Sequence, residues 1–134
     1  MNTLGWIATA VAIGGATYFV LKSKTISKNI NSKIEESLKK KIITASEDVD
    51  ELRMADVVSY FKSKNPVKGR DIPFVATVAG FSQVVSLPNK ENGFILGIFN
   101  DSTSNITEIK LIYAKRVDEK LKSAMGSEQL IVLK

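Results

Sequence analysis

Three charged side chains in the second half of the sequence could together carry out hydrolytic chemistry: Asp101, Glu108 and Lys110. An acid followed by Glu-x-Lys is the order used in restriction-type nuclease cores, where two carboxylates hold magnesium and a lysine assists the attacking water. The same residues also arise by chance where a polar loop precedes an exposed strand, and short acid-x-Lys matches are common. We therefore keep these three as weak catalytic candidates, and a nuclease ranks last among the functions considered.

The composition removes most other catalytic chemistry. The 134 residues include no histidine and no cysteine. The chain therefore has no thiol nucleophile, no imidazole base, and none of the usual ligands of zinc, haem or iron–sulfur clusters. We expect no enzyme, no cofactor and no metal site. The length suits one domain of ordinary size plus an additional short segment.

The net charge of +5 is concentrated in one short segment. Residues 22–41 contain seven lysines and two glutamates, whereas residues 42–134 contain twelve basic and twelve acidic residues. A nucleic-acid-binding surface normally spreads its basic residues over a folded face. Because the excess here directly follows an apolar stretch, we expect it to contact anionic lipid headgroups and not nucleic acid. The headgroup candidates are Lys22, Lys24, Lys28, Lys33, Lys39, Lys40 and Lys41.

The apolar stretch runs from Leu4 to Leu21, 18 residues without a charge. As a helix it would be about 27 Å long, close to the roughly 30 Å of a bilayer core. No basic residue precedes it, which argues against a secretory signal peptide. We predict a single-pass membrane anchor over residues 1–22, the alternative being a buried core helix. The lysines that follow place the N-terminus outside and the C-terminus in the cytoplasm, or inside a membrane-containing particle.

Small residues fall on one face of that predicted helix. Spacings of three and four residues align Gly5, Ala8, Ala12, Gly15 and Ala16. Such a row lets another helix approach closely and gain van der Waals contacts. It predicts packing on a partner's helix or a homo-oligomer through this segment. The alternative is that small residues are simply frequent in membrane helices.

Residues 23–43 have the pattern of a basic amphipathic juxtamembrane helix. An isoleucine or leucine recurs every four residues, at Ile26, Ile30, Ile34, Leu38 and Ile42. At 3.6 residues per turn, this stripe winds slowly around the helix. It fits a helix lying on the headgroups. It fits equally a helix that packs its isoleucines on the following domain.

Residues 44–134 predict a small α+β domain with one docked helix and an antiparallel sheet of about five strands. The helix is expected over 46–63, because Thr44 and Glu47 have capping-box spacing and acidic residues crowd positions 47–51. Its apolar face consists of Met54, Val57, Val58 and Phe61.

Short runs of branched and aromatic residues, separated by turn formers, predict the strands. Asn92-Gly93 indicates a tight turn, and Gly126 ends a short helix expected over 118–125. Alternation along 106–117 predicts a strand with one buried and one wet face. The predicted strands are 72–81, 83–88, 93–100, 106–117 and 129–133.

These features favour a structural protein: a single-pass anchor whose domain ties a protein assembly, such as a virion lattice or an envelope complex, to a bilayer. The expected partners are anionic lipid and the proteins of that assembly. The alternative is a binding module that recruits a soluble partner to the membrane, for instance by offering a sheet edge.

Overall fold

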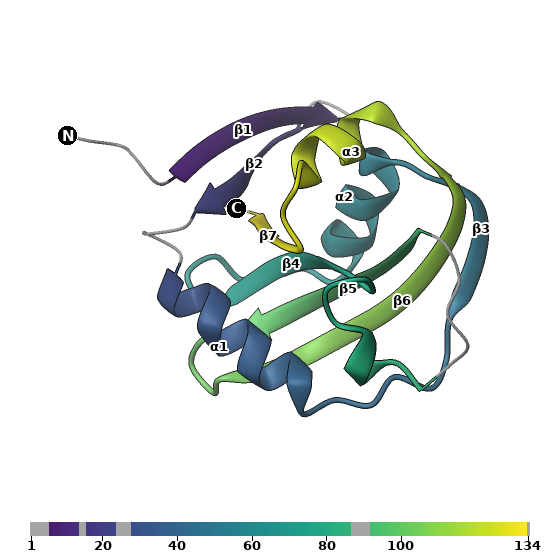
Figure 1. Ribbon diagram of the computed structural model, residues 1–134. Helices are drawn as coiled ribbons and strands as arrows, with labels where there is room; N and C mark the ends of the chain where they lie inside the picture. The colour runs from purple at the N-terminus through teal and green to yellow at the C-terminus, as the bar shows by residue number, and fades with distance from the viewer. Residues whose placement is uncertain (1–5, 14–15, 24–27, 87–91, 134) are drawn as a thin grey trace.

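The computed structural model describes residues 6–13, 16–23, 28–86 and 92–133, and within them the chain forms one mixed sheet with helices on both faces (Figure 1). The elements in chain order are β1 (Trp6–Ile13), β2 (Ala16–Ser23), α1 (Lys28–Lys39), β3 (Glu47–Leu52), α2 (Met54–Ser63), β4 (Asp71–Thr77), the 3₁₀ helix η1 (Ser82–Val84), β5 (Gly93–Asn100), β6 (Asn105–Val117), α3 (Glu119–Met125) and β7 (Leu130–Leu133).

The strand order across the sheet is β1-β2-β7-β4-β5-β6-β3. The expected α+β class is confirmed, with three α-helices and five strands in the described part that follows β2. The expectation of an antiparallel sheet is wrong, because β3 pairs in parallel with β6, from Glu47 opposite Ile112 to Leu52 opposite Val117. Strands β3, β4 and β6 all run in the same direction. Helix α2 returns the chain between the end of β3 and the start of β4, as a connection between strands of the same direction requires.

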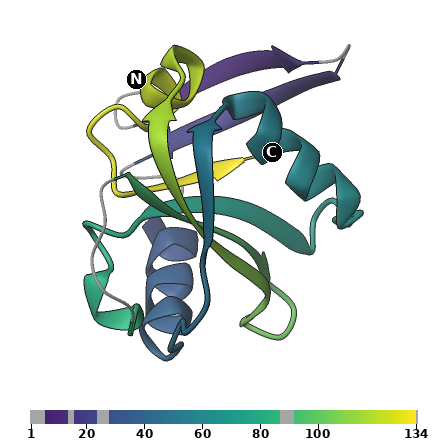
Figure 2. The ribbon, with the colours of Figure 1, turned by 90° about the vertical axis from the view of Figure 1, so that its right-hand side faces the viewer.

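Two apolar clusters lie on the two faces of the sheet. Helices α2 and α3 pack with Leu96 and Ile112 on one face. Helix α1 and the segment around η1 pack with Phe74 and Leu111 on the other. Figures 1 and 2 show α1 on the opposite side of the sheet from α2. The prediction of a wet face along β6 is therefore wrong for its centre, since Leu111 and Ile112 point to opposite faces and both are buried.

The helix predicted over 46–63 begins later, at Met54. The N–H of Arg53 donates to the Asp56 carboxylate (3.0 Å), and the N–H of Met54 donates to Asp118 (3.2 Å), so the helix start is capped there. The acidic residues before it form the edge strand β3, where their exposed charges oppose pairing with other chains. The predicted apolar face is confirmed, as Met54, Val57, Val58 and Phe61 are buried.

The other strands agree with the sequence pattern except at 83–88. Over its described residues 83–86 the chain forms the end of η1 and a single bridge between Ile43 and Val85, so the strand predicted there is wrong, while residues 87 and 88 lie outside the described residues. Helix α3 is capped at its start by Asp118, whose carboxylate accepts the N–H of Leu121 (2.9 Å), and is terminated by Gly126 as predicted, with φ 54°.

The structure does not show the predicted membrane helix. Trp6–Ile13 and Ala16–Ser23 are strands that pair with each other, and β2 joins β7 through Val20–Leu133 and Leu21–Val132. The segment is rich in β-branched and aromatic residues, which suits a strand that completes a free sheet edge. No helix within the described ranges is long and apolar enough to cross a membrane. The predicted small-residue face is thus distributed differently: Ala8 and Ala12 lie in β1, Ala16 lies in β2, and Gly5 and Gly15 lie outside the described residues.

The apolar stripe predicted along residues 23–43 lies on the side of α1 that faces the sheet. Ile34 and Leu38 have no exposed surface, and Ile30 packs against the same cluster. The stripe therefore packs on the domain, while Ile42, just after the helix, is 76% exposed. Ile26 lies outside the described residues.

The turn before β4 holds an ion pair that makes the stability depend on pH. Asp71 accepts a guanidinium N–H of Arg70 (2.9 Å) and the N–H of Val67 (2.8 Å), and these bonds, the one from Arg70 first, hold the pKa of its carboxyl below the usual range. A carboxyl with a lowered folded-state pKa stabilises the fold above its unfolded pKa of about 4, and this stabilisation is lost as the pH falls through the folded pKa. We expect Asp71→Asn to flatten the fall in unfolding free energy below about pH 4, measured by urea unfolding.

The matched control is Asp50→Asn, which removes a carboxylate whose side chain is 83% exposed and 3.6 Å from Lys115. Exposed pairs of this kind contribute little to stability. An acid limb of the same steepness in Asp71→Asn and the parent protein would contradict the assignment.

Candidate functional site: a groove at the open edge of β6

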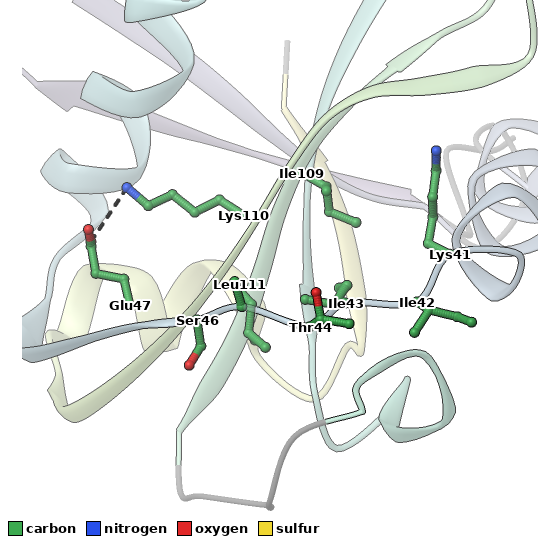
Figure 3. A pocket seen from close by; sticks show the side chains of 10 residues that line it. Lys41, Ile42, Ile43, Thr44, Ser46, Glu47, Ile109, Lys110 and Leu111 are labelled. Atoms are coloured by element: carbon green, nitrogen blue, oxygen red, sulfur yellow. Dashed lines mark ion pairs between the residues drawn. The ribbon is translucent and has the colours of Figure 1, made fainter.

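The described surface contains a groove of about 370 Å³ beside the edge strand. Its walls are the segment 41–47, which leads from α1 into β3, and residues 109–111 of β6 (Figure 3). We call it the edge groove. Ile42 and Ile43 on one wall and Ile109 and Leu111 on the other make it largely apolar, with Lys41 at its α1 end.

The edge groove exists because β3 leaves β6 early. Their pairing begins at Glu47 opposite Ile112. Before that point the chain turns toward the segment after η1, where the N–H of Ile43 donates to Val84 (2.7 Å) and the N–H of Ser86 donates to Ile43 (3.0 Å). Ile43 is buried in the apolar cluster on the α1 side of the sheet, the one that contains Phe74 and Leu111. This burial fixes the path of the chain. No described strand therefore continues along this side of β6 before Ile112.

The backbone of β6 presents hydrogen-bonding groups to this gap. The N–H of Ala114 donates to Asn92 (3.1 Å), so residue 114 faces β5. In an antiparallel ladder alternate residues face alternate sides. Residues 110 and 112 therefore also face β5, whereas Ile109 and Leu111 face the other side. The parallel register of Glu47 opposite Ile112 directs the C=O of Leu111 to the N–H of Glu47, so the groups left toward the edge groove are the N–H and C=O of Ile109 and the N–H of Leu111. This edge resembles an ordinary sheet edge in chemistry, but it is only a few residues long.

Charges on the far side of β6 are already paired. Lys110 lies 3.4 Å from Glu47 and its ammonium lies 5.5 Å from the centre of the Tyr60 ring. Figure 3 shows Lys110 turned toward Glu47, with Ile109 and Leu111 on the other side of the strand. Burial, and secondarily the charge of Glu108, raise the pKa of the Tyr60 hydroxyl. The Tyr60 hydroxyl therefore stays neutral, and Lys110 contacts both Glu47 and Tyr60 on this side of β6.

The three weak catalytic candidates are held by separate partners. Asp101 lies 3.5 Å from Lys33 of α1, whereas Glu108 lies 3.3 Å from Lys64 at the end of α2. Helices α1 and α2 cover opposite faces of the sheet. Lys110 is paired with Glu47. The structure therefore does not bring the two carboxylates and the lysine together, and no group of three acidic side chains in the described ranges could hold a metal ion.

The headgroup candidates lie mainly on the outward side of α1 and just after it. Lys33, Lys39 and Lys40 are exposed, and Lys41 is half-buried in the wall of the edge groove. Lys22 lies in β2 and Lys28 is the first residue of α1, while Lys24 lies outside the described residues. The helix thus separates its isoleucines, directed at the sheet, from lysines directed at solvent.

Sequence reasoning did not find the edge groove. Its signal was the run Ile42-Ile43-Thr44, whose branched residues suggest extended chain more than the end of a helix. No family model, curated protein or solved structure matches the chain.

Proposed function

We propose that this protein is a membrane-anchored structural protein that holds a protein partner at a bilayer. The observation that carries the proposal is the division of α1 into two faces directly after the uncharged run. Its isoleucines are used by the domain and Lys33 lies 3.5 Å from Asp101, so the exposed Lys39 and the following Lys40 are left for another surface. Each lysine near an anionic membrane contributes about 1 kcal/mol of attraction.

The anchor in this proposal is the uncharged run from Leu4 to Leu21. Two stranded segments cannot enter lipid as they stand, because the outer edge of β1 would leave backbone groups without hydrogen bonds. A helix satisfies those groups internally, and entry would detach the hairpin from β7 at only two residue pairs. We infer that the segment is a strand pair on the domain in water and a spanning helix in lipid.

The scaffold role follows from what the rest of the chain offers. The folded part contains two packed clusters and an open strand edge, which suits attachment of another protein. In this arrangement the domain lies on the lysine-rich, cytoplasmic or particle-interior side. A protein lattice or envelope complex would be attached there, and the small residues of the run would allow helix pairing or a homo-oligomer. Recruitment of a soluble partner is the second form of the same role.

The anchor is tested by washing membranes from cells that make the full chain with alkaline carbonate. We expect the parent protein to stay in the membrane pellet, and Ala12→Arg to be released, because arginine at a helix centre costs about 2.5–3.5 kcal/mol of insertion. Ala79→Arg makes the identical change at an exposed position of the domain away from the edge groove and serves as the matched control. Release of the parent protein would overturn the proposal. If the parent protein stays in the membrane pellet, crosslinking in intact membranes followed by mass spectrometry would identify the partner.

A further inference from the structure

We propose that the edge groove binds an extended peptide segment of a partner protein, in which apolar side chains alternate with acidic ones. The segment would add to β6 as a short extra strand in line with β3. This inference rests on the proposed function, since it names how that protein partner is held. It concerns the described surface alone and does not depend on how the first 22 residues are arranged.

The backbone argument is the first support. The N–H and C=O of Ile109 and the N–H of Leu111 face the groove, and the pairing with β3 on that side begins with the C=O of Leu111 and the N–H of Glu47. An incoming extended chain can satisfy these groups in the way β3 does further along β6. Strand addition of this kind takes its affinity from main-chain hydrogen bonds and its specificity from alternate side chains.

The side chains that line the groove decide which peptide fits. On the α1 side of β6, the exposed Ile42 and the half-buried Ile109 offer apolar surface for every second side chain of an added strand. Exposed apolar side chains beside an open strand edge are a usual feature of interaction sites. A peptide of uniformly polar residues would leave this surface in water.

Charge selects an acidic peptide. Lys41 lines the groove and has no anionic partner within the described ranges, whereas Lys110 is already paired with Glu47. Lys39 and Lys40, also without anionic partners there, add positive potential at the same end. The positive potential of these three lysines favours an acidic peptide, whereas a basic peptide would meet like charge.

The experiment uses the full chain in nanodiscs and a fluorescent ten-residue peptide of alternating valine and glutamate. Binding is followed by fluorescence anisotropy at about 0.15 M salt. We expect saturable binding that is weakened about tenfold in Ile42→Asp and in Lys41→Glu. Val67→Asp and Lys120→Glu make the same changes at exposed positions away from the groove and should bind as the parent does.

Two further probes separate strand addition from simple charge attraction. A peptide of alternating valine and lysine should not bind, and neither should the valine–glutamate peptide with its central residues replaced by proline, which lacks the N–H groups of a strand. Hydrogen exchange at the amides of Ile109 and Leu111 should slow about tenfold when the valine–glutamate peptide saturates the protein.

Several outcomes would overturn the inference: no saturable binding, equal binding of the proline-containing peptide, or unchanged exchange at Ile109 and Leu111. Displacement of the peptide by millimolar inorganic phosphate would identify a small-anion site instead. Slowed exchange at these amides that rises with protein concentration in the absence of peptide would identify a second copy as the occupant. Failure of the anchor is seen separately, as release by carbonate, and would leave the peptide result intact.

Discussion

Replacing Leu38 by alanine is expected to lower the free energy of unfolding by about 2–5 kcal/mol. Leu38 has no exposed surface and lies in the cluster that contains Phe74, Phe99 and Leu111. Truncation removes three carbon atoms from a packed interior and leaves a cavity that the rigid sheet cannot close. Because small domains are stable by only about 5–15 kcal/mol, this one change would remove a large share of the total. Urea unfolding followed by circular dichroism measures it.

Ile42→Ala is the matched control, because Ile42 follows four residues later in the same sequence stripe but is 76% exposed. We expect a change within about 0.5 kcal/mol there. The same reasoning predicts that a fragment 44–134 lacks a stable fold, since it would expose the surface that Ile34 and Leu38 cover. It should bind a hydrophobic dye and unfold without a sharp transition. Equal stability of Leu38→Ala and Ile42→Ala would show that α1 is a detached connector.

The parts of the fold that could be predicted from the sequence are those governed by local chemistry. The strand β5 is a continuous apolar run because both of its faces are covered. Helix α3 follows from the capping residue Asp118 and the terminating Gly126. These patterns act over a few neighbouring residues, so one sequence is enough to recognise them.

The errors lie where pairing with distant residues decides the outcome. Acidic residues at 47–51 resemble a helix start, but pairing with β6, more than sixty residues away, makes them an edge strand. The run around Gly14-Gly15 is different, since it carries both a hairpin signal and the pattern of a membrane helix. The described strands on either side pair with each other, and the membrane helix stays a prediction.

The candidate site was beyond sequence reasoning for the same reason. The edge groove is defined by where β3 separates from β6, and that point depends on Ile43 reaching the segment after η1. No motif marks such a gap, because its principal groups are backbone atoms that every residue has. Recruitment of a partner by a sheet edge could be proposed from the sequence. The place of that edge, at residues 109–111, can be found only from the strand register.

Gly97→Ala is expected to destabilise the fold by about 2–3 kcal/mol, with a fall of roughly 10 °C in the melting temperature. Gly97 lies opposite Phe74 in the β4–β5 ladder. An added Cβ would lie 2.6 Å from Cε2 of Phe74 and 3.0 Å from the carbonyl oxygen of Glu108. Both distances are too short, and Phe74 is fully buried beneath α1, so its ring has no free space to enter. In an exposed strand the same change would be mildly stabilising, since glycine weakens strands.

A double-mutant cycle separates this clash from other effects of the new methyl group. Phe74→Leu alone should cost about 1–2 kcal/mol through the cavity it leaves. Combined with Gly97→Ala, it should cost at least about 1 kcal/mol less than the sum of the single changes, because the methyl group then fills part of that cavity. Additive effects, measured by urea unfolding of all four proteins, would mean that the Phe74 ring does not lie over Gly97. Phe74 belongs to the same buried cluster as Ile34 and Leu38 of α1, so a displaced Phe74 ring would also disturb the surface on which α1 packs.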